Sequence, residues 1–417
     1  MLKCDLLVDS KDLRATLLKL KKDDDFTILL DMTAVDYSKF PDSTPSRFAV
    51  VYVLRSSDFK KETTVKAFVS DETLSVDTVS DIFPSANWAE REAYDQYGVI
   101  FLNHPNLKRV LNHKQFVGHP LRKDYKITQG QICTETDDLM DEMLPLLKSK
   151  GYTDEEIADL MLLNVGPSHP ASHGTIRNFV ALEGETIAAC VTEIGYLHRG
   201  FEKACEHHTY SQVIPYTDRL NYCSAILNNI GWAKAIEDMM KIEITPRAKM
   251  IRVVIGELSR IIDHFVCNAA NMVDLGGLTS LWYLFGARDQ AYDLLSKLTG
   301  ARLTNTYTRI GGLEFDLYDG FDKDLEEVLK TSEKAIEDVL SLIAHNKLFH
   351  DRTQDVGVIK PDFALANGIS GPNLRAAGVA HDLRKDKPYY GYENFDFDVV
   401  IGSHGDVYDR MMCRFEE

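Results

Sequence analysis

The feature that most limits the fold of this chain is a long amphipathic segment at residues 246–277, PRAKMIRVVIGELSRIIDHFVCNAANMVDLGG. Proline suits the first turn of a helix and glycine suits its end, so Pro246 and the pair Gly276–Gly277 mark the limits of one helix. A helix with a broad apolar face is stable only when other elements cover that face. The apolar residues at helical spacing are Ile251, Val254, Leu258, Ile261, Ile262 and Phe265.

Three further segments, 215–240, 278–300 and 322–349, are predicted as long helices from the same kind of spacing. The second of them ends at Gly300, a residue type that commonly closes helices. Four long helices in one unit favour a helical bundle core. The chain from residue 164 onward is therefore predicted to be mainly α-helical.

The N-terminal part, residues 1–127, is predicted as an α+β domain. Helical spacing over residues 11–22 and 87–98 alternates with β-rich runs, and residues 103–125 are typical of a loop. No glycine-rich phosphate loop follows any strand, which argues against a dinucleotide site. The β-rich runs are FTILLDMTAVDY, FAVVYVLRS and TTVKAFVS.

Residues 128–163 are polar and acidic, as expected of a solvated linker between two domains. Within this segment Thr153 and Glu156 have the spacing of a capping box, which predicts a short helix. A second domain is then expected over residues 164–417.

Composition excludes several classes of function. The formal net charge is −17 over 417 residues and no basic tract offsets it, so nucleic acid is a poor partner. No run of about eighteen apolar residues predicts a membrane span, and the N-terminus lacks the apolar region of a signal peptide. The seven cysteines form no CxxC pair, so we expect a reducing compartment and no metal held by this chain.

A glycine-bracketed loop, GPSHPASHG, places two histidines four residues apart. On a helix, His169 and His173 would share one face and could bind a metal. Pro170 stands between them and prevents that helix, because proline lacks the N–H group and clashes with the preceding turn. We therefore expect two imidazoles on a stiff loop.

Polar residues also interrupt the long apolar helix, and two interpretations remain open for them. They pair with one another or cap chain ends, or they contribute to a polar pocket that exchanges protons with an organic ligand. The residues concerned are Arg252, Arg260, His264 and Asp274 on the helix, with His169, His173, Arg199 and Tyr222 elsewhere.

A series of motifs resembles the quinone-site D subunit, the 49-kilodalton type, of respiratory complex I. The resemblance covers almost everything from residue 164 to the end, and residues 88–125 are similar to the neighbouring C subunit, the 30-kilodalton type. The chain thus resembles a fusion of the C and D subunits. The motifs are GPSHPASHGTIR, IGYLHRGFEK, PYTDRLNY, PRAKMIRVVIGELSRIIDH, VDLGGLT, GARLTNTYTRIGGLEFD and GPNLRAAGVAHDLRKDKPYYGY for D, and WAEREAYDQYGVIF, HPNLKRVL and GHPLRKDY for C.

The resemblance implies the fold of complex I D subunits and of nickel–iron hydrogenase large subunits for residues 164–417. It implies a peripheral-arm subunit of a proton-pumping NADH:quinone oxidoreductase that forms the quinone-reduction pocket. The terminal 4Fe–4S cluster would be carried by the partner B subunit, and no metal by this chain. Implied partners are the B, I and G subunits and the membrane-embedded H subunit, on the cytoplasmic side of the bacterial inner membrane.

The same resemblance assigns roles to five residues. His173 matches the histidine that bonds one quinone carbonyl, Tyr222 matches the tyrosine that bonds the other, and Asp274 matches the aspartate paired with that histidine. His169, on the same loop, and Arg199 are the expected cofactor-binding residues, and Arg199 matches the arginine against the partner's cluster. A structural turn held by hydrogen-bonded histidines is the alternative interpretation for His169. A reduced quinone carries negative charge on both oxygens, so donors are needed at both ends of the ring.

Three departures from the family pattern accompany these matches. Thr304 stands where the family often has a histidine, Asn221 replaces the aspartate of RLDY, and the family's C-terminal region is absent after Glu417. The motifs distinguish neither ubiquinone from menaquinone nor NADH from another electron donor.

Two other functions are compatible with parts of the pattern. A nickel–iron hydrogenase would need a CxxC pair where this chain has Cys223 alone, in DRLNYCSA. The second alternative is a non-catalytic scaffold subunit of a related membrane-bound, hydrogenase-like complex. The set of His173, Tyr222 and Asp274 argues against a purely structural role.

Overall fold

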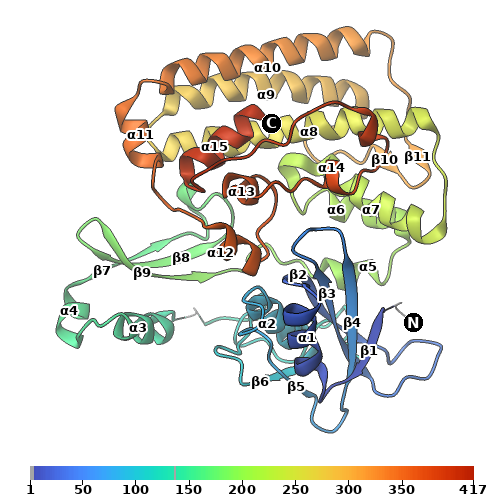
Figure 1. Cartoon of the computed structure of the whole chain (residues 1–417), viewed down its shortest axis with the longest axis vertical. Coiled ribbons are helices and arrows are strands. Elements are labelled where there is room, and N and C mark those ends of the chain that lie inside the picture. Colours follow the sequence, from blue (N-terminus) through green and yellow to red (C-terminus); the bar gives the residue numbers. More distant parts are fainter. Residues whose placement is uncertain (1–3, 136–137) are drawn as a thin grey trace. The chain divides into compact units, whose positions relative to one another are not determined.

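The computed structural model describes residues 4–135 and 138–417 and divides into two compact units (Figure 1). The first contains the chain up to Ala204 together with Ala366–Gly368, and the second contains Cys205–Leu365 and Ile369–Glu417. These units are defined by contacts within the structure, whereas the domain limits at 127/128 and 163/164 were predicted from sequence motifs. Those limits stay a prediction. Each unit is described by itself below.

The first unit begins with a four-stranded sheet in the order β1-β4-β3-β2. Strand β1 is parallel to β4, and the other neighbours are antiparallel. Leucines of α1 and alanines of α2 belong to the same apolar core as the inward-facing residues of the sheet. The two helices and three β-rich runs predicted over this region are confirmed as α1 (Leu13–Asp23), α2 (Ala86–Tyr97), β2 (Ile28–Asp36), β3 (Phe48–Arg55) and β4 (Glu62–Val69). Strand β1 (Leu6–Asp9) and the short parallel pair β5 (Ser75–Asp77) and β6 (Ile100–Leu102) were not predicted.

A second, three-stranded antiparallel sheet follows in the same unit, in the order β7-β8-β9. One face packs against α3 around Phe179, Ala181 and Ala189. The predicted capping box is confirmed, because the Thr153 side chain accepts from the Glu156 N–H at the start of α4. The chain from residue 164 onward was predicted to be mainly helical, and that prediction missed β8 and β9. The elements are α3 (Met140–Ser149), α4 (Asp154–Asp159), β7 (Met161–Val165), β8 (Arg177–Glu183) and β9 (Thr186–Glu193).

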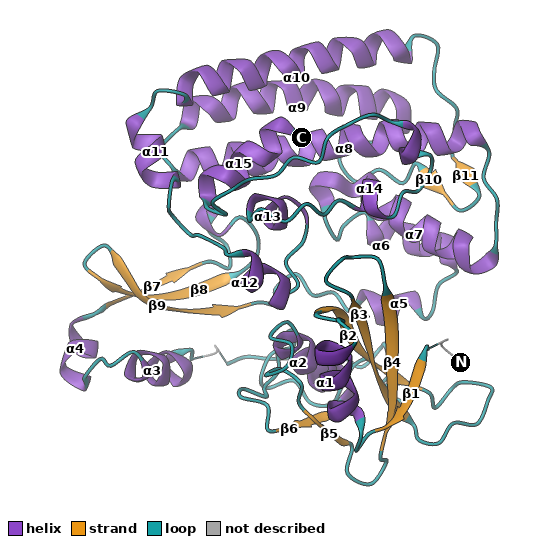
Figure 2. Ribbon diagram, in the orientation of Figure 1, coloured by secondary structure: helices purple, strands orange, loops and turns teal. Residues whose placement is uncertain are grey.

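The second unit is built on four long helices, as predicted (Figure 2). The 29-residue helix α8 packs against α7 and α9, and α9 packs against α10. Helix α8 starts where its sequence predicts, with Pro246 in the first turn and the Thr245 hydroxyl accepting from the Ala248 N–H. Gly300 closes α9 in the left-handed conformation, at φ 79°. The bounds are α7 (Ala225–Met240), α8 (Pro246–Asp274), α9 (Leu278–Thr299) and α10 (Phe321–Ile343).

The prediction of one helix over residues 215–240 was wrong. The chain instead forms α6 (Tyr210–Thr217), a 3-10 turn η2 (Tyr222–Ser224) and then α7. Short polar side chains stabilise the break locally, because the Asn221 amide donates to the Ser224 hydroxyl at 2.7 Å. Similarly, the predicted 322–349 helix ends early, and an Asn346 cap starts α11. The remaining elements are η1 (Pro170–Ser172), α5 (Phe201–Cys205), β10 (Thr308–Arg309), β11 (Gly312–Leu313), α11 (Lys347–Thr353), α12 (Pro361–Ala366), α13 (Gly371–Ala376), α14 (Leu383–Asp386), η3 (Tyr392–Asn394) and α15 (Val407–Glu416).

Two arginines that interrupt α8 are paired with carboxylates inside the second unit. Arg252 is fully buried and makes a bidentate ion pair with Glu237, at 2.7 and 2.8 Å. Burial alone would raise the pKa of Glu237, but the hydrogen bonds from Arg252 and from the Gly311 N–H bring that pKa below its ordinary value. Arg260 pairs with Glu257 at 3.0 Å. Both arginines are thus paired internally, with Glu237 and Glu257 and not with the other polar residues of the predicted set.

Replacing Glu237 with glutamine should destabilise the second unit by about 3–5 kcal/mol, because it leaves the Arg252 guanidinium buried without its counter-charge. Urea unfolding followed by circular dichroism would measure the change. The matched control is Glu326→Gln, which removes a solvent-exposed pair with Lys330 and should cost less than about 1 kcal/mol. Equal stabilities of the two variants would contradict this account of the core.

Candidate functional site

The GPSHPASHG loop connects β7 to β8 in the first unit, and its two ends touch. A Cβ atom at Gly166 would lie 1.9 Å from the carbonyl oxygen of Ile176, so a side chain cannot be placed there. Gly166 also has φ 96°, which residues with side chains rarely adopt. The loop therefore leaves and rejoins the sheet at one narrow point.

Within that loop the two histidines have different environments. His169 precedes the turn η1 and its Nδ1 accepts from the Ala171 N–H at 3.1 Å, which is a capping role. His173 ends the turn in the left-handed conformation, at φ 50°, and its N–H donates to the Pro170 carbonyl at 3.3 Å. Both side chains are exposed.

Tyr222 lies in η2 of the second unit, at the break between α6 and α7. Its side chain is 47% exposed, and its hydroxyl makes no hydrogen bond within residues 4–135 and 138–417. The neighbouring Asn221 amide reaches Asp263 on α8 at 3.5 Å, which ties this turn to the long helix. The break in the helical pattern, which periodicity did not predict, is what presents the phenol to the surface.

Asp274 is the last residue of α8, and its side chain is exposed. Asp274 follows Asp263 by three helical turns, about 16 Å along the axis of α8. The turn that presents Tyr222 contacts α8 at Asp263, so it lies at a different level of the helix from Asp274. Close to the end of α8 lies a hollow of about 330 Å³ whose wall is partly apolar and partly polar, and Asp274 is not among the residues that line it. The wall includes Met272, Leu275, Leu278, Leu342, Leu348 and Phe349 together with Thr279, Ser280 and Asn346.

The fifth candidate, Arg199, follows β9 in the first unit and is exposed. His169, His173 and Arg199 thus belong to the first unit, and Tyr222 and Asp274 to the second. The pairing of His173 with Asp274 and the role of Arg199 stay predictions.

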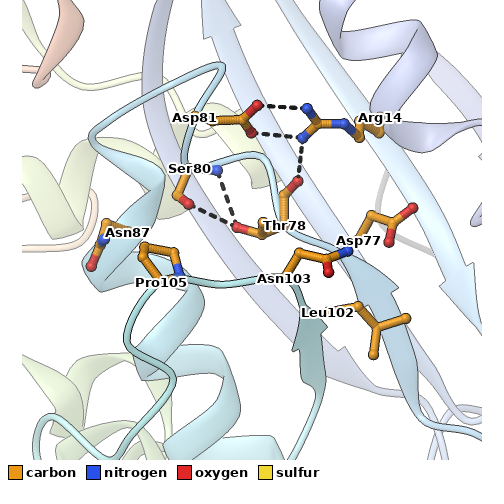
Figure 3. A pocket seen from close by; sticks show the side chains of 9 residues that line it. All are labelled: Arg14, Asp77, Thr78, Ser80, Asp81, Asn87, Leu102, Asn103 and Pro105. Carbon is orange, nitrogen blue, oxygen red and sulfur yellow. Dashed lines mark hydrogen bonds and ion pairs between the residues drawn. The ribbon is translucent and has the colours of Figure 1, made fainter.

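A polar hollow of about 520 Å³, which no sequence motif predicts, lies in the first unit beside β5 and β6 (Figure 3). Arg14 is the only cationic side chain that lines it among the described residues. Its guanidinium donates to the Asp81 carboxylate at 2.6 Å and to the Thr78 carbonyl at 2.7 Å. Behind it, burial raises the pKa of Glu90 to about 7, and the carboxyl accepts from Thr78 and Val79. With its cation already paired, this hollow is poorly suited to an anion.

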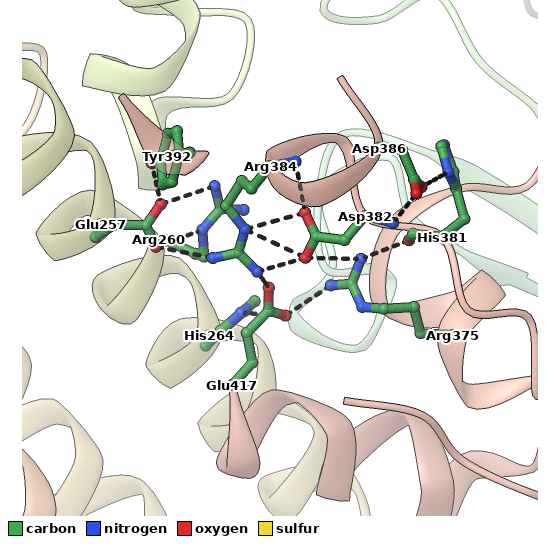
Figure 4. Close-up of polar contacts among 10 residues, drawn as sticks. All are labelled: Glu257, Arg260, His264, Arg375, His381, Asp382, Arg384, Asp386, Tyr392 and Glu417. Atoms are coloured by element: carbon green, nitrogen blue, oxygen red, sulfur yellow. Dashed lines mark hydrogen bonds and ion pairs between the residues drawn. The ribbon is translucent and has the colours of Figure 1, made fainter. Parts of the chain in front are cut away.

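A buried ionic cluster of the second unit is a further feature, and the sequence indicates only part of it (Figure 4). His264 faces Glu417 at 3.2 Å, and Glu417 also accepts from Arg375 at 2.7 Å and from Arg384. Glu257 accepts from Arg384 at 3.0 Å and from the Tyr392 hydroxyl. The helical pattern singles out only His264 and Arg260, because most of their partners lie far away in sequence.

Neither a metal cluster nor a membrane span is found in the described part of the chain. No group of three or more His, Cys, Asp or Glu side chains in residues 4–135 and 138–417 is arranged to hold a metal ion. Over the same residues, no helix has the length and apolar character needed to cross a membrane.

Comparison with known proteins identifies the family. Residues 6–131 match the model of the respiratory-chain NADH dehydrogenase 30 Kd subunit, and residues 274–417 match that of the 49 Kd subunit. The C/D subunit of NADH-quinone oxidoreductase from Bdellovibrio bacteriovorus is 46% identical over 413 residues, which cover 98% of this chain and 72% of that protein. The proteins of the same name from Chromohalobacter salexigens and Psychrobacter cryohalolentis are each 38% identical, over 94% of this chain and 68% of their own. These matches confirm the resemblance seen in the motifs: the chain belongs to the family of fused C/D subunits of NADH-quinone oxidoreductase, respiratory complex I.

Proposed function

We propose that this chain forms the quinone-reduction pocket of its complex, and that His173, Tyr222 and Asp274 act on the quinone. The observation that carries the proposal is a contrast in exposure. The Arg252 guanidinium of the α8 core is fully buried, whereas these three side chains are exposed. Two exposed donors and an exposed carboxylate are suited to a ligand that another subunit helps to enclose.

The chemistry of quinone reduction fits these residue types. Two electrons and two protons convert the two carbonyl oxygens to hydroxyls, so a hydrogen-bond donor is needed at each end of the ring. The Tyr222 phenol offers one donor, and it makes no bond within the described part of the chain. The His173 imidazole offers the other donor through a ring N–H. Asp274 would accept a hydrogen bond from that imidazole and orient it.

A hollow near the end of α8 offers both kinds of contact that an organic ligand needs. Its leucine, methionine and phenylalanine side chains suit an apolar ring or tail, and Thr279, Ser280 and Asn346 offer polar contacts. Electrons would come from the terminal 4Fe–4S cluster of the partner B subunit. The exposed Arg199 guanidinium would favour the reduced, more negative state of that cluster. His169 would keep the loop in shape through its cap on η1.

The remaining parts of the proposal follow from family membership. The chain would contact the B, I and G subunits and the membrane-embedded H subunit, on the cytoplasmic side of the bacterial inner membrane. The second unit would have the fold shared by complex I D subunits and nickel–iron hydrogenase large subunits. The alternative of a non-catalytic scaffold differs in one respect, since it requires no role for the exposed donors.

Replacing Tyr222 with phenylalanine should lower quinone turnover about a hundredfold, because it removes one donor to a quinone oxygen that gains charge during reduction. The measurement is NADH:quinone oxidoreductase activity of the assembled complex with a short-chain quinone. Cluster content and assembly should stay unchanged. Tyr210→Phe is the matched control, because that phenol is 49% exposed on α6 of the same unit. Turnover within about twofold of wild type for Tyr222→Phe would support the scaffold alternative instead.

His173 and Asp274 should behave as one unit in a double-mutant cycle. His173→Ala and Asp274→Asn should each lower turnover by about a hundredfold or more, since both disable the same proton donor. The turnover of the double variant should then be no more than about twofold below that of the less active single variant, because the effects of residues that act together are not additive. Losses that multiply would show two independent residues and no pairing.

A further inference from the structure

Glu90 on α2 is a carboxyl group enclosed by the first unit, and it is 0% exposed. One of its oxygens accepts from the Val79 N–H at 2.8 Å, and the other accepts from the Thr78 hydroxyl. A carboxylate that is removed from water needs a cation beside it as well as hydrogen bonds, unless it takes up a proton. The groups that face Glu90 therefore decide whether it carries a charge.

The nearest candidate for a cation is His104, whose Nε2 lies 3.9 Å from the Glu90 carboxyl, but its hydrogen bonds make the ring neutral. Nε2 lies 3.0 Å from the Asn87 carbonyl, which can only accept, so Nε2 carries a proton. Nδ1 accepts from the Asn106 N–H at 3.0 Å, so Nδ1 carries none. Burial and the charge of Arg91 also lower the pKa of His104. His104 thus supplies no positive charge to Glu90.

The other charged or titratable neighbours leave Glu90 without a counter-charge as well. On α1, the Arg14 guanidinium donates to both oxygens of Asp81 at 2.6 Å and to the Thr78 carbonyl at 2.7 Å. Asp81 is itself an anion, and its charge opposes a second one nearby. On β3, the Tyr52 phenol stays neutral, because burial and the nearby Glu90 raise its pKa. Within the described residues, no lysine or arginine forms an ion pair with Glu90.

Thr78 connects Glu90 both to α1 and to the polar hollow (Figure 3). Its carbonyl accepts from Arg14, and its hydroxyl lies between the Glu90 carboxyl and the Ser80 hydroxyl, which is 2.9 Å away. Ser80 lines the hollow. A row of hydroxyls can pass a proton along by reversing the direction of its hydrogen bonds. Protonated Glu90 would donate to the Thr78 oxygen from which ionised Glu90 accepts, so the same contacts serve both states.

We propose that Glu90 is a proton-binding site, and that its protonation makes the attachment of α2 to the turn at residues 78–81, and with it the stability of the first unit, sensitive to pH. Burial opposes the charged form and raises the pKa of Glu90 from an ordinary value of 4.5 to about 7. The contacts all lie within residues 6–131, and further chain over the hollow would only deepen the burial. The proposal is independent of the quinone chemistry above.

The direction of the effect follows from where the proton is held more tightly. With its pKa raised by burial, the folded chain holds this proton more tightly than the unfolded chain does. The contribution of Glu90 to stability is then fully present below about pH 4.5, where both states are protonated, and is lost as the pH rises to about 7. Between about pH 5 and pH 7, the unfolding equilibrium constant of the first unit should rise about tenfold or more because of this group.

Urea unfolding of the full-length chain between about pH 5 and pH 8 tests the proposal, with hydrogen exchange of the β3 amides reporting on the first unit alone. Glu90→Gln cannot ionise, yet its amide still offers an acceptor to Val79 and a donor to Thr78, so this variant should lose the tenfold pH dependence. Glu155→Gln, which removes an exposed carboxyl of α4, should keep the wild-type dependence. Parallel pH dependences of wild type and Glu90→Gln would overturn the proposal.

Infrared spectroscopy gives a second test that does not require Glu90→Gln to fold. A protonated carboxyl absorbs separately from ionised ones, and in the wild-type chain the band of Glu90 should disappear with a midpoint near pH 7. Thr78→Val removes a hydroxyl that favours the ionised form, so it should move that midpoint upward by about one pH unit. The absence of any carboxyl band that titrates near neutral pH, or a band that Thr78→Val leaves in place, would exclude Glu90 as the site.

Discussion

A buried ionic cluster holds the final segment of the chain against α8, and the arrangement of the second unit depends on it. Three carboxylates, Glu257, Asp382 and Glu417, face three guanidinium groups, Arg260, Arg375 and Arg384 (Figure 4). Although burial opposes ionisation, the bonds from His264 and the charge of Arg375 keep the pKa of Glu417 well below its ordinary value. Charges desolvated in this way stabilise a structure only when all members are in place, so the cluster selects one packing of the short helices around it.

The long helix that anchors this cluster also carries Asp274 and contacts the turn that presents Tyr222. The 3-10 turn that presents Tyr222 is tied to α8 through Asn221 and Asp263, and Asp274 ends the same helix. A rigid helix that is locked along its buried side can hold exposed groups on its other side at fixed separations. Helix α8 therefore has two functions in the second unit. It buries ion pairs on one side and holds exposed groups at the surface on the other.

Sequence patterns predicted the long elements well and the local exceptions poorly. Helical spacing of apolar residues located α8, α9 and the start of α10, because burial of one face is a requirement that every such helix shares. The break before Tyr222 is held by local polar contacts such as the Asn221–Ser224 hydrogen bond, and β7 has only five residues, so neither produces a periodic signal. The roles of the candidate residues came from resemblance alone. Spacing along the chain does not reveal which of Glu417, Arg384 or His264 meet, since their contacts join distant parts of the sequence.

The narrow point at Gly166 has a consequence for how the histidine loop can vary. The loop leaves and rejoins the sheet where Gly166 touches the Ile176 carbonyl. Strands β7 and β8 therefore end at the same contact whatever residues lie in the loop between them. The residues in between can change in length or conformation without shifting the register of β7 and β8. The reach of the His173 imidazole is therefore adjustable separately from the stability of the sheet that supports it. Insertions or deletions in this loop can therefore move an exposed imidazole relative to the sheet while the sheet keeps its sequence.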